Sequence, residues 1–204
     1  MAEQPFEIIA APFTVWIAPV GEAFPAIEDA PAGNWTKVGT NGDVNYTEDG
    51  VTVSHPQTVE TFRPLGRTGP VKAFRTEEEL RIAFTLADIS LEQYAHALNQ
   101  NAVTDVAPGA AAGYRKIGLS RGRQVAQRAL LIRGNESPYG EGAAGDWNLQ
   151  YEVPVAFQGG EPEPVYVKGE PAGLALEWMA LDDPNAASDD ERFGRLIAQD
   201  ADAT

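Results

Sequence analysis

The sequence predicts a mainly β fold: an antiparallel β-sandwich or partly open barrel with one flanking α-helix and a long β-hairpin arm. Hydrophobic residues alternate with a period of two in several segments, as in half-buried strands. Gly- and Pro-rich breakers separate these segments, and the regular strand–helix alternation of a parallel fold is missing. With 204 residues, 43% of them hydrophobic, the chain is long enough for one domain with a substantial core.

Two segments show the alternation most clearly. In "LRIAFTL" every second side chain lies on the same face, and these side chains are Leu80, Ile82, Phe84 and Leu86. "LQYEVPVAF" at 149–157 alternates in the same way, and because Pro154 lacks a ladder donor this strand should be an edge or carry a bulge. Further strands are expected at 13–19, 43–48, 51–60, 124–133, 164–168 and 173–181, with a hairpin turn at "EDG" (48–50) and a long loop at 20–34.

One helix is expected at about 90–99, in "DISLEQYAHALNQN". Ser90 has the position of an N-cap, and Gln93 follows at the spacing of a capping box. The side chains at helical spacing form an apolar stripe that should dock on a sheet: Leu91, Tyr94, Ala95 and Leu98. Glu92 and His96 lie off this stripe and are expected to face solvent.

The chain is expected to form a single domain over 1–184, with the arm at about 56–75, followed by an acidic C-terminal extension at 185–204. A short capped helix is predicted within that extension, in "SDDERFGRLIAQ". The start, "MAEQPFEIIAAPF", lacks the basic region and long apolar run of a signal peptide. No apolar stretch approaches the roughly 20 residues of a membrane span. We therefore expect a soluble protein without membrane insertion, which stays or assembles in the cytoplasm.

Charge is unevenly distributed along the chain. The net charge of −15 argues against a general nucleic-acid binder, which needs clustered positive charge. Ten of the 15 basic residues nevertheless lie in two windows, 63–75 and 115–133, and neither window contains an acid. This asymmetry indicates complementary surfaces between copies or toward another partner. The alternative is that these basic residues pair with acids of the same subunit.

The sequence offers few residues in arrangements suited to catalysis. The absence of cysteine excludes disulfides and thiolate metal sites. His55 and His96 lack the clustered spacing of metal ligands, and no phosphate-binding loop or nucleophile elbow is present. We therefore expect no catalytic residue, no metal and no cofactor, and no enzymatic activity. Four tryptophans raise the alternative of a carbohydrate-binding module, although Trp178 is expected in the core and Trp35 is expected to close the sandwich.

The order of features resembles a known family. "NWTKVGTNGDVNYTEDGVTVS" is followed by the arm and helix segment "VETFRPLGRTGPVKAFRTEEELRIAFTLADISLEQYAHALN", and later by "PVAFQGGEPEPVYVKGEPAGLALEWMALDD". Together these resemble the tail tube protein, or major tail protein, of long-tailed bacteriophages and related gene transfer particles, over about three quarters of the chain. The resemblance implies two packed β-sheets, hexameric rings stacked into a tube, and a place in the virion tail after assembly in the bacterial host cytoplasm. It also implies tail terminator, tape-measure and distal tail proteins as partners.

The resemblance assigns roles to the charged residues. The arm should lie on a neighbouring subunit through its four basic side chains, which are Arg63, Arg67, Lys72 and Arg75. A second inter-subunit patch is expected at Arg115, Lys116, Arg121 and Arg123. Glu77 and Glu79 are candidates for the wall of a lumen through which DNA passes without specific binding, because acidic side chains repel phosphates. Three other readings stay open: a particle-decorating or carbohydrate-binding β-sandwich module, a nucleic-acid binder that uses the two basic windows, and a hydrolase.

Overall fold

The structure is a computed structural model that describes residues 9–109, 111–139 and 147–200. Within these residues the chain is mainly β, with antiparallel sheets and one α-helix. Its elements are β1 (Phe13–Ala18), β2 (Thr36–Lys37), η1 (Gly42–Asn45), β3 (Tyr46–Ser54), β4 (Gln57–Phe62), β5 (Lys72–Glu78), β6 (Arg81–Leu86), α1 (Leu91–Ala97), β7 (Val103–Val106), β8 (Tyr114–Ile117), β9 (Gln127–Gly134), β10 (Leu149–Gln158), β11 (Leu174–Ala180), η2 (Asp189–Glu191) and β12 (Arg195–Ala198).

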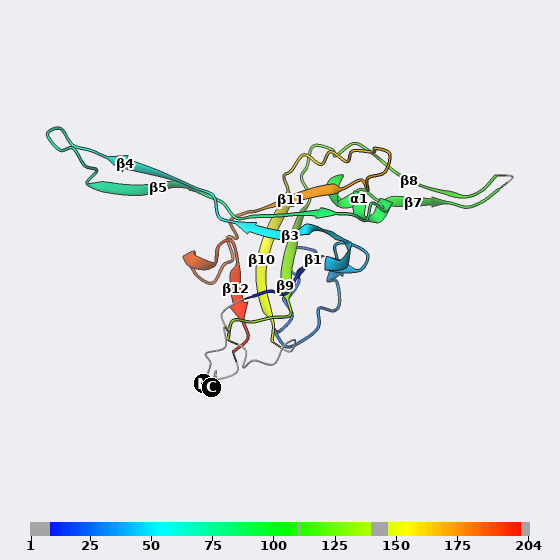
Figure 1. Ribbon diagram of the computed structural model, residues 1–204, viewed down its shortest axis with the longest axis horizontal. Coiled ribbons are helices and arrows are strands. Elements are labelled where there is room, and N and C mark those ends of the chain that lie inside the picture. Colours follow the sequence, from blue (N-terminus) through cyan, green and yellow to red (C-terminus); the bar gives the residue numbers. More distant parts are fainter. Residues whose placement is uncertain (1–8, 110, 140–146, 201–204) are drawn as a thin grey trace.

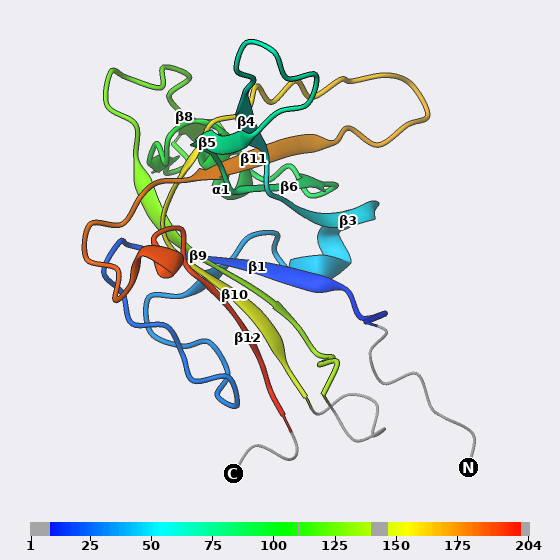
Figure 2. The same ribbon diagram turned by 90° about the vertical axis from the view of Figure 1, so that its left-hand side faces the viewer.

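One continuous antiparallel sheet forms the body. Its strand order is β2-β1-β9-β10-β11-β6-β3, and β12 pairs with β10 beside this path. The sheet bends into two layers, in which β11, β6 and β3 cross over β1, β9, β10 and β12 (Figures 1 and 2). This arrangement is consistent with the predicted sandwich. The hairpins β4–β5 and β7–β8 are separate two-stranded sheets that project from the body on opposite sides.

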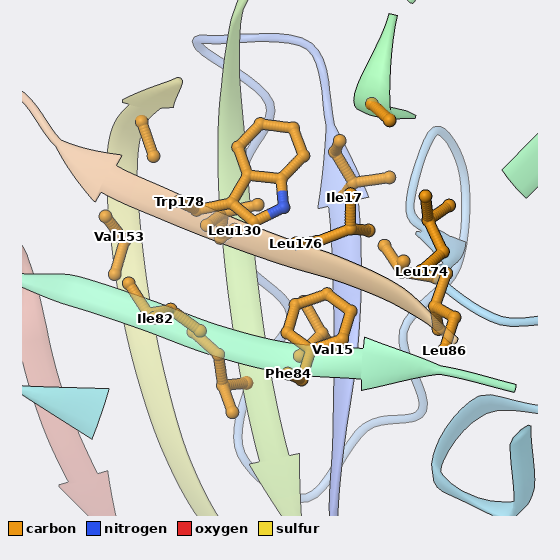
Figure 3. Close-up of a cluster of buried hydrophobic side chains, with 14 of the residues drawn as sticks. Val15, Ile17, Ile82, Phe84, Leu86, Leu130, Val153, Leu174, Leu176 and Trp178 are labelled. Carbon is orange, nitrogen blue, oxygen red and sulfur yellow. The ribbon is translucent and has the colours of Figure 1, made fainter. Parts of the chain in front are cut away.

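The core fills the space between the two layers. On β6 the predicted alternation is confirmed, because Leu80, Ile82, Phe84 and Leu86 are all buried. They pack against Trp178 and other apolar side chains from both layers (Figure 3). Full burial of one such side chain is worth about 1.5–3 kcal/mol relative to exposure, so this cluster is the main source of stability.

Pro154 marks a change of partner in the middle of β10. The strand lies inside the sheet, so the prediction of an edge strand is wrong. The alternative, a bulge, is confirmed by the shift in the β9 pairing between Val153 and Ala156. N-terminal to the bulge β10 pairs with β12, and beyond it with β11. Pro154 has no backbone N–H to donate, and it therefore lies at a position where the sheet does not require this hydrogen bond.

The second face of β10 is buried as well, which the sequence did not predict. Gln150 and Glu152 lie on this face and are almost fully buried. The loop expected at 20–34 is present and covers them: Gln150 Nε2 donates to the carbonyl of Pro25, and Arg133 donates to the carbonyls of Ala26 and Asp29. A polar ladder therefore runs under the loop.

The polar ladder links two arginines through neutral and acidic partners. Arg133 Nε donates to Gln150 Oε1 at 2.8 Å, and Gln150 Nε2 donates to Glu152 Oε1 at 2.6 Å. Arg195 Nε completes it by donating to Glu152 Oε2 at 2.7 Å. Burial lowers the pKa of Arg133, whereas the hydrogen bond that Arg195 donates to Glu152 raises the pKa of Arg195. Each buried polar group on this face thus has a partner, as burial requires.

Several predicted elements are wrong. The strand expected at 43–48 begins as the 3-10 helix η1, and the one expected at 51–60 is interrupted between Ser54 and Gln57. The "EDG" segment is not a hairpin turn, because β3 runs through it with an irregular register between Tyr46 and Val51, where Gly50 has a φ of 65°. Residues 164–168 form no strand, since no other described segment pairs with them. The predicted C-terminal helix is replaced by the short η2 and by β12, which joins the sheet at β10.

The helix α1 begins as predicted, at an N-cap provided by Ser90, whose Oγ accepts from the backbone N–H of Gln93 at 3.3 Å. The second half of the expected capping box is absent, because Gln93 Oε1 instead accepts from the N–H of Gly39 at 2.7 Å. Ser90 N–H donates to Asp88 Oδ1 in its place. The helix is thereby tied to the loop after β2 as well as to its own first turn.

Candidate assembly surfaces on two hairpin arms

The first arm is the hairpin β4–β5. Its register pairs Gln57 with Glu78 and Phe62 with Lys72, with a bulge between Thr58 and Val59. Every residue of both strands is exposed. The arm is continuous with the body, because only Glu79 and Leu80 separate β5 from the buried strand β6. It projects far from the sheet, at the left of Figure 1.

This arm carries an unusual share of exposed apolar side chains. Phe62 and Phe74 are both about half exposed, and Leu65 at the tip is fully exposed. The register pairs Glu60 with Phe74 and Phe62 with Lys72. Because paired residues point to the same side, and side chains on one strand alternate, both phenylalanines lie on one face. Val59 and Val71 add further apolar surface to the arm.

The four basic residues of the first arm differ in their contacts. Arg75 is held within the chain, since it donates to Gln57 Oε1 at 2.9 Å and forms an ion pair with Glu78 at 3.2 Å. Arg63 donates to the carbonyl of Thr68 at 3.3 Å, across the tip. For Arg67 and Lys72 no side-chain partner is found in the part of the chain that the structure describes. The alternative of pairing with acids of the same subunit thus applies to Arg75. Among the described residues, no carboxylate partner is found for Arg63, Arg67 or Lys72.

The second arm is the hairpin β7–β8, on the opposite side of the body. Of its predicted basic patch, Arg115 is paired internally, with Glu92 at 2.7 Å and Asp105 at 2.8 Å. Lys116 is exposed on β8, and Arg121 and Arg123 are exposed on the following loop. The structure therefore does not bring the two predicted basic sets together.

Two asparagines fasten the loop that follows β8. Asn99 Nδ2 donates to the carbonyls of Arg121 and Gln124, both at 2.7 Å, and its Oδ1 accepts from the N–H of Ala126. Asn101 Nδ2 donates to the carbonyls of Gly118 and Ser120. Asn99 adopts a left-handed conformation, with a φ of 60°, which asparagine tolerates better than most residues. The loop at 118–126 is thus held against the end of α1.

The prediction that His96 faces solvent is wrong. It is buried, and Gln100 Nε2 lies 3.0 Å from its Nδ1. Burial lowers the pKa of His96 to about 4, and the charge of nearby Arg128 acts in the same direction, against the hydrogen bond with Gln100. The imidazole is therefore neutral at pH 7. Glu92 is exposed, as predicted.

The two predicted lumen acids lie at the root of the first arm. Glu77 is exposed on β5 and accepts a hydrogen bond from Thr58 Oγ1 at 3.0 Å. Glu79 forms an ion pair with Arg81 at 2.6 Å, and Arg81 also pairs with Glu177 at 3.0 Å. Glu79 and Glu177 raise the pKa of Arg81. Glu79 is therefore partly neutralised within the subunit.

The structure adds exposed apolar residues that the charge pattern did not reveal. Besides the phenylalanines of the first arm, Val165, Tyr166 and Val167 are exposed on the loop between β10 and β11. The sequence contained a signal for these exposed residues, because 164–168 has the composition of a strand. A segment of this kind that pairs with no other strand leaves its apolar side chains in water. Exposed contiguous apolar residues are typical of interaction surfaces.

Comparison with protein-family models and with curated proteins finds no match to this chain. Across the described residues, no helix has the length and hydrophobicity that crossing a membrane requires.

Proposed function

We propose that this chain is a structural virion protein that self-assembles into hexameric rings, which stack to form the tail tube of a long-tailed bacteriophage or related gene transfer particle. The tube conducts DNA into the host cell. The antiparallel β body with one helix supports this proposal, as does the order of sequence features from Trp35 to Asn99. Tail terminator, tape-measure and distal tail proteins are the partners expected at the ends of the tube.

The observation that carries the proposal is the β4–β5 arm. An isolated two-stranded ribbon is marginally stable in water unless another surface covers it. Here both strands are exposed, and the arm presents Phe62, Leu65 and Phe74 together with unpaired cations. A neighbouring subunit supplies both the apolar cover and the carboxylates that this ribbon lacks. Edge strands that are a liability in a monomer become assembly surfaces in this way.

The charged residues take different roles in this proposal. Arg63, Arg67 and Lys72 contact a neighbouring subunit, whereas Arg75 stabilises the root of its own arm. Lys116, Arg121 and Arg123 form the second inter-subunit patch, with Arg115 fixing the base of the second arm. Each exposed ion pair contributes only about 0–1 kcal/mol, so stability of the tube comes from many repeated contacts.

The remaining acidity of the chain suits the lumen. Each phosphate paired with a lysine or arginine strengthens DNA binding and makes it salt-dependent. A wall with excess negative charge keeps transit loose, and Glu77 and Glu79 are the candidates for such a wall. Of these two, Glu77 offers more free charge, because Glu79 is paired with Arg81.

Electron microscopy and sedimentation velocity of the purified chain test the proposal. The full chain should form rings or tubes. A variant in which Asn-Gly replaces residues 60–74 joins the paired residues Val59 and Arg75 by a favourable turn, and should give a folded monomer with an unchanged melting temperature. If the full chain stays a monodisperse monomer at high concentration, the proposal is wrong.

A carbohydrate-binding module is the weaker candidate. Trp35 and Trp178 are buried, so they offer no exposed platform for a sugar ring. Trp16 is half-buried and has the ammonium of Lys37 over its ring, 5.2 Å from the centroid.

A further inference from the structure

A groove lies at the root of the first arm, next to the segment that contains η2, which is drawn in orange-red below the arm root in Figure 1. Its apolar part is a pocket of about 350 Å³, lined by His55, Leu80, Tyr151, Val153, Phe193 and Leu196 among others. A second pocket, of about 410 Å³, adjoins the first and shares Glu78, Asp190 and Phe193 with it. We call the two pockets together the root groove.

The rim of the root groove is acidic. The segment 182–193 contains five acids and one arginine, and three of these acids, Asp182, Asp189 and Asp190, line the groove together with Arg192 and Arg75. Arg192 pairs with Asp182 at 3.5 Å and with Asp189 at 2.8 Å. Asp190 lines both pockets and has no side-chain partner within the described residues. The groove thus combines an apolar floor with an acidic rim, on which Asp190 is the carboxylate without a partner among the described residues.

The tip of the β4–β5 arm has the opposite character. Residues 62–72 contain no acid and carry three cations, Arg63, Arg67 and Lys72, for which the described residues provide no carboxylate partner. Leu65 is fully exposed at the tip, and Phe62 is half exposed beside it. An apolar side chain flanked by cations matches an apolar pocket flanked by carboxylates, because Asp190 and the two acids that share Arg192 can accept contacts from the cations of the tip.

The tip of the arm cannot reach the groove of its own chain, although Arg75 at the arm root lines it. Ten residues separate Thr68 at the tip from Glu78 at the root. At about 3.3 Å per residue in an extended strand, the tip lies about 30 Å from the root. Any tip that enters the root groove therefore belongs to another copy.

The other projecting segments fit the groove less well. The tip of the second arm, residues 107–113, contains no charged residue. The loop at 118–126 carries Arg121 and Arg123, but Asn99 and Asn101 hold it against the body. The first arm is the segment that combines reach, positive charge and an exposed apolar tip.

We propose that the root groove receives the tip of the β4–β5 arm from a second copy of this chain, with Leu65 on the apolar floor and Arg67 and Lys72 against the acidic rim. The inference rests on the proposed function in one respect, which is that copies of the chain associate. It adds the receiving surface, and it assigns the acidic segment 182–193 to assembly.

Site-directed cross-linking tests this contact directly, because the chain has no cysteine of its own. One variant carries Thr68→Cys at the arm tip, and a tagged second variant carries Ser188→Cys beside the groove. Mixed and oxidised, they should form a disulfide-linked heterodimer. Ala112→Cys, at the exposed tip of the second arm, is the matched control and should not cross-link to Ser188→Cys. Equal cross-linking of the control, or none from Thr68→Cys, overturns the proposal.

Charge reversal gives an independent test. Arg67→Glu and Asp190→Arg should each raise the concentration needed for assembly by about tenfold or more, and the double variant should recover most of the loss. Lys168→Glu changes the net charge equally, on an exposed loop residue, and should have little effect. If Asp190→Arg instead rescues Arg121→Glu and not Arg67→Glu, the groove receives the 118–126 loop and the proposal is wrong.

The two proposals fail in distinguishable ways. Rings or tubes without the Thr68–Ser188 cross-link overturn the root groove and leave the tail tube standing. A specific cross-link in particles that never exceed a dimer supports the groove and overturns the tube. Monomers without a cross-link overturn both.

Discussion

Both hairpin arms leave the sheet body as two-stranded antiparallel ribbons, and both carry basic residues, yet the chain treats them differently. The second arm is anchored at its base: Arg115 bridges it to Glu92 of α1, and α1 lies against both β7 and β8. In the first arm the described side-chain contacts to carboxylates lie near the root, where Arg75 meets Glu78, while Arg63 at the tip contacts only the carbonyl of Thr68. Beyond the root, its cations and phenylalanines face solvent.

The difference teaches how to separate a structural basic residue from an assembly residue. Seen in the sequence, the two basic windows look alike. In the structure, a cation that already has two carboxylates, such as Arg115, has little left to offer a neighbour. A cation without any, such as Arg67, gains most from a partner that supplies one.

The largest expected effect concerns the helix that supports the second arm. Leu98 is buried at the end of α1. Leu98→Ala should lower the free energy of unfolding by about 2–5 kcal/mol, through lost burial and the cavity left behind. Hydrogen exchange should then rise in β7–β8 and stay unchanged in β4–β5, which α1 does not support. A loss near zero in a denaturant titration would mean that the buried face of α1 is wrongly assigned.

A pH dependence should follow from His96, again on the side of the second arm. Its pKa is about 4 in the folded chain, against an ordinary value of 6.5. The unfolded chain therefore binds more protons between these values, and stability falls as the pH drops from 6.5 to 4. The full difference corresponds to about 3 kcal/mol.

The His96→Asn variant isolates this effect, because the carboxylates titrate in both proteins and cancel in the comparison. Unfolding free energies of the two proteins should converge as the pH falls from 6.5 to 4. A difference that is constant over this range would show that His96 is not buried in its neutral form.

A smaller effect is expected at Asn99, which fastens the loop after β8. Asn99→Gly keeps the left-handed backbone accessible and removes three side-chain hydrogen bonds, so it should cost about 1–3 kcal/mol. Asn99→Ala should cost more, since alanine disfavours a φ of 60°. Thermal unfolding of both variants measures the two contributions. Equal losses would mean that the backbone conformation carries no cost.

The smallest effect compares the two arms directly. Arg115→Ala removes two exposed ion pairs and should cost the monomer about 0–1 kcal/mol. Arg67→Ala has no such pair to lose, so the stability of the monomer should not change, whereas assembly should weaken. Chemical denaturation of dilute protein, together with sedimentation at high concentration, separates the two readouts. If Arg67→Ala destabilised the monomer and Arg115→Ala weakened assembly, the roles assigned to the two arms would be wrong.

Local signals predicted the parts of the fold that depend on local chemistry. The alternation at 80–86 identified the buried face of β6, and the N-cap at Ser90 located the start of α1. The bulge at Pro154 followed from a missing donor. In each case the residue type itself restricts the backbone or its surroundings.

The parts that sequence reasoning missed depend on distant segments. Gln150 and Glu152 read as an exposed face, and only the loop at 20–34 makes them buried. His96 lies off the apolar stripe, yet it is covered in the folded chain. Residues 164–168 have strand composition without a neighbour to pair with. Burial and pairing are properties of two segments, so neither can be read from one.

The same limit applies to the candidate surfaces. The sequence located the two basic windows and the first arm, but neither the second arm nor which basic residues are neutralised within the chain. It also indicated an acidic C-terminal extension at 185–204, without showing that the acids at 189 and 190 border an apolar groove at the root of the arm.

The partner exchange along β10 has a mechanical consequence. One uninterrupted strand is bonded to β12 and β9 in one layer and, past Pro154, to β11 of the other. Separating the layers therefore requires breaking β10 out of the sheet, and not merely sliding two faces apart. A pull on the first arm passes through β5 into β6, then to β11 and β10. The body should resist such a load as one unit, so that strain arriving at the arm is shared by the whole subunit.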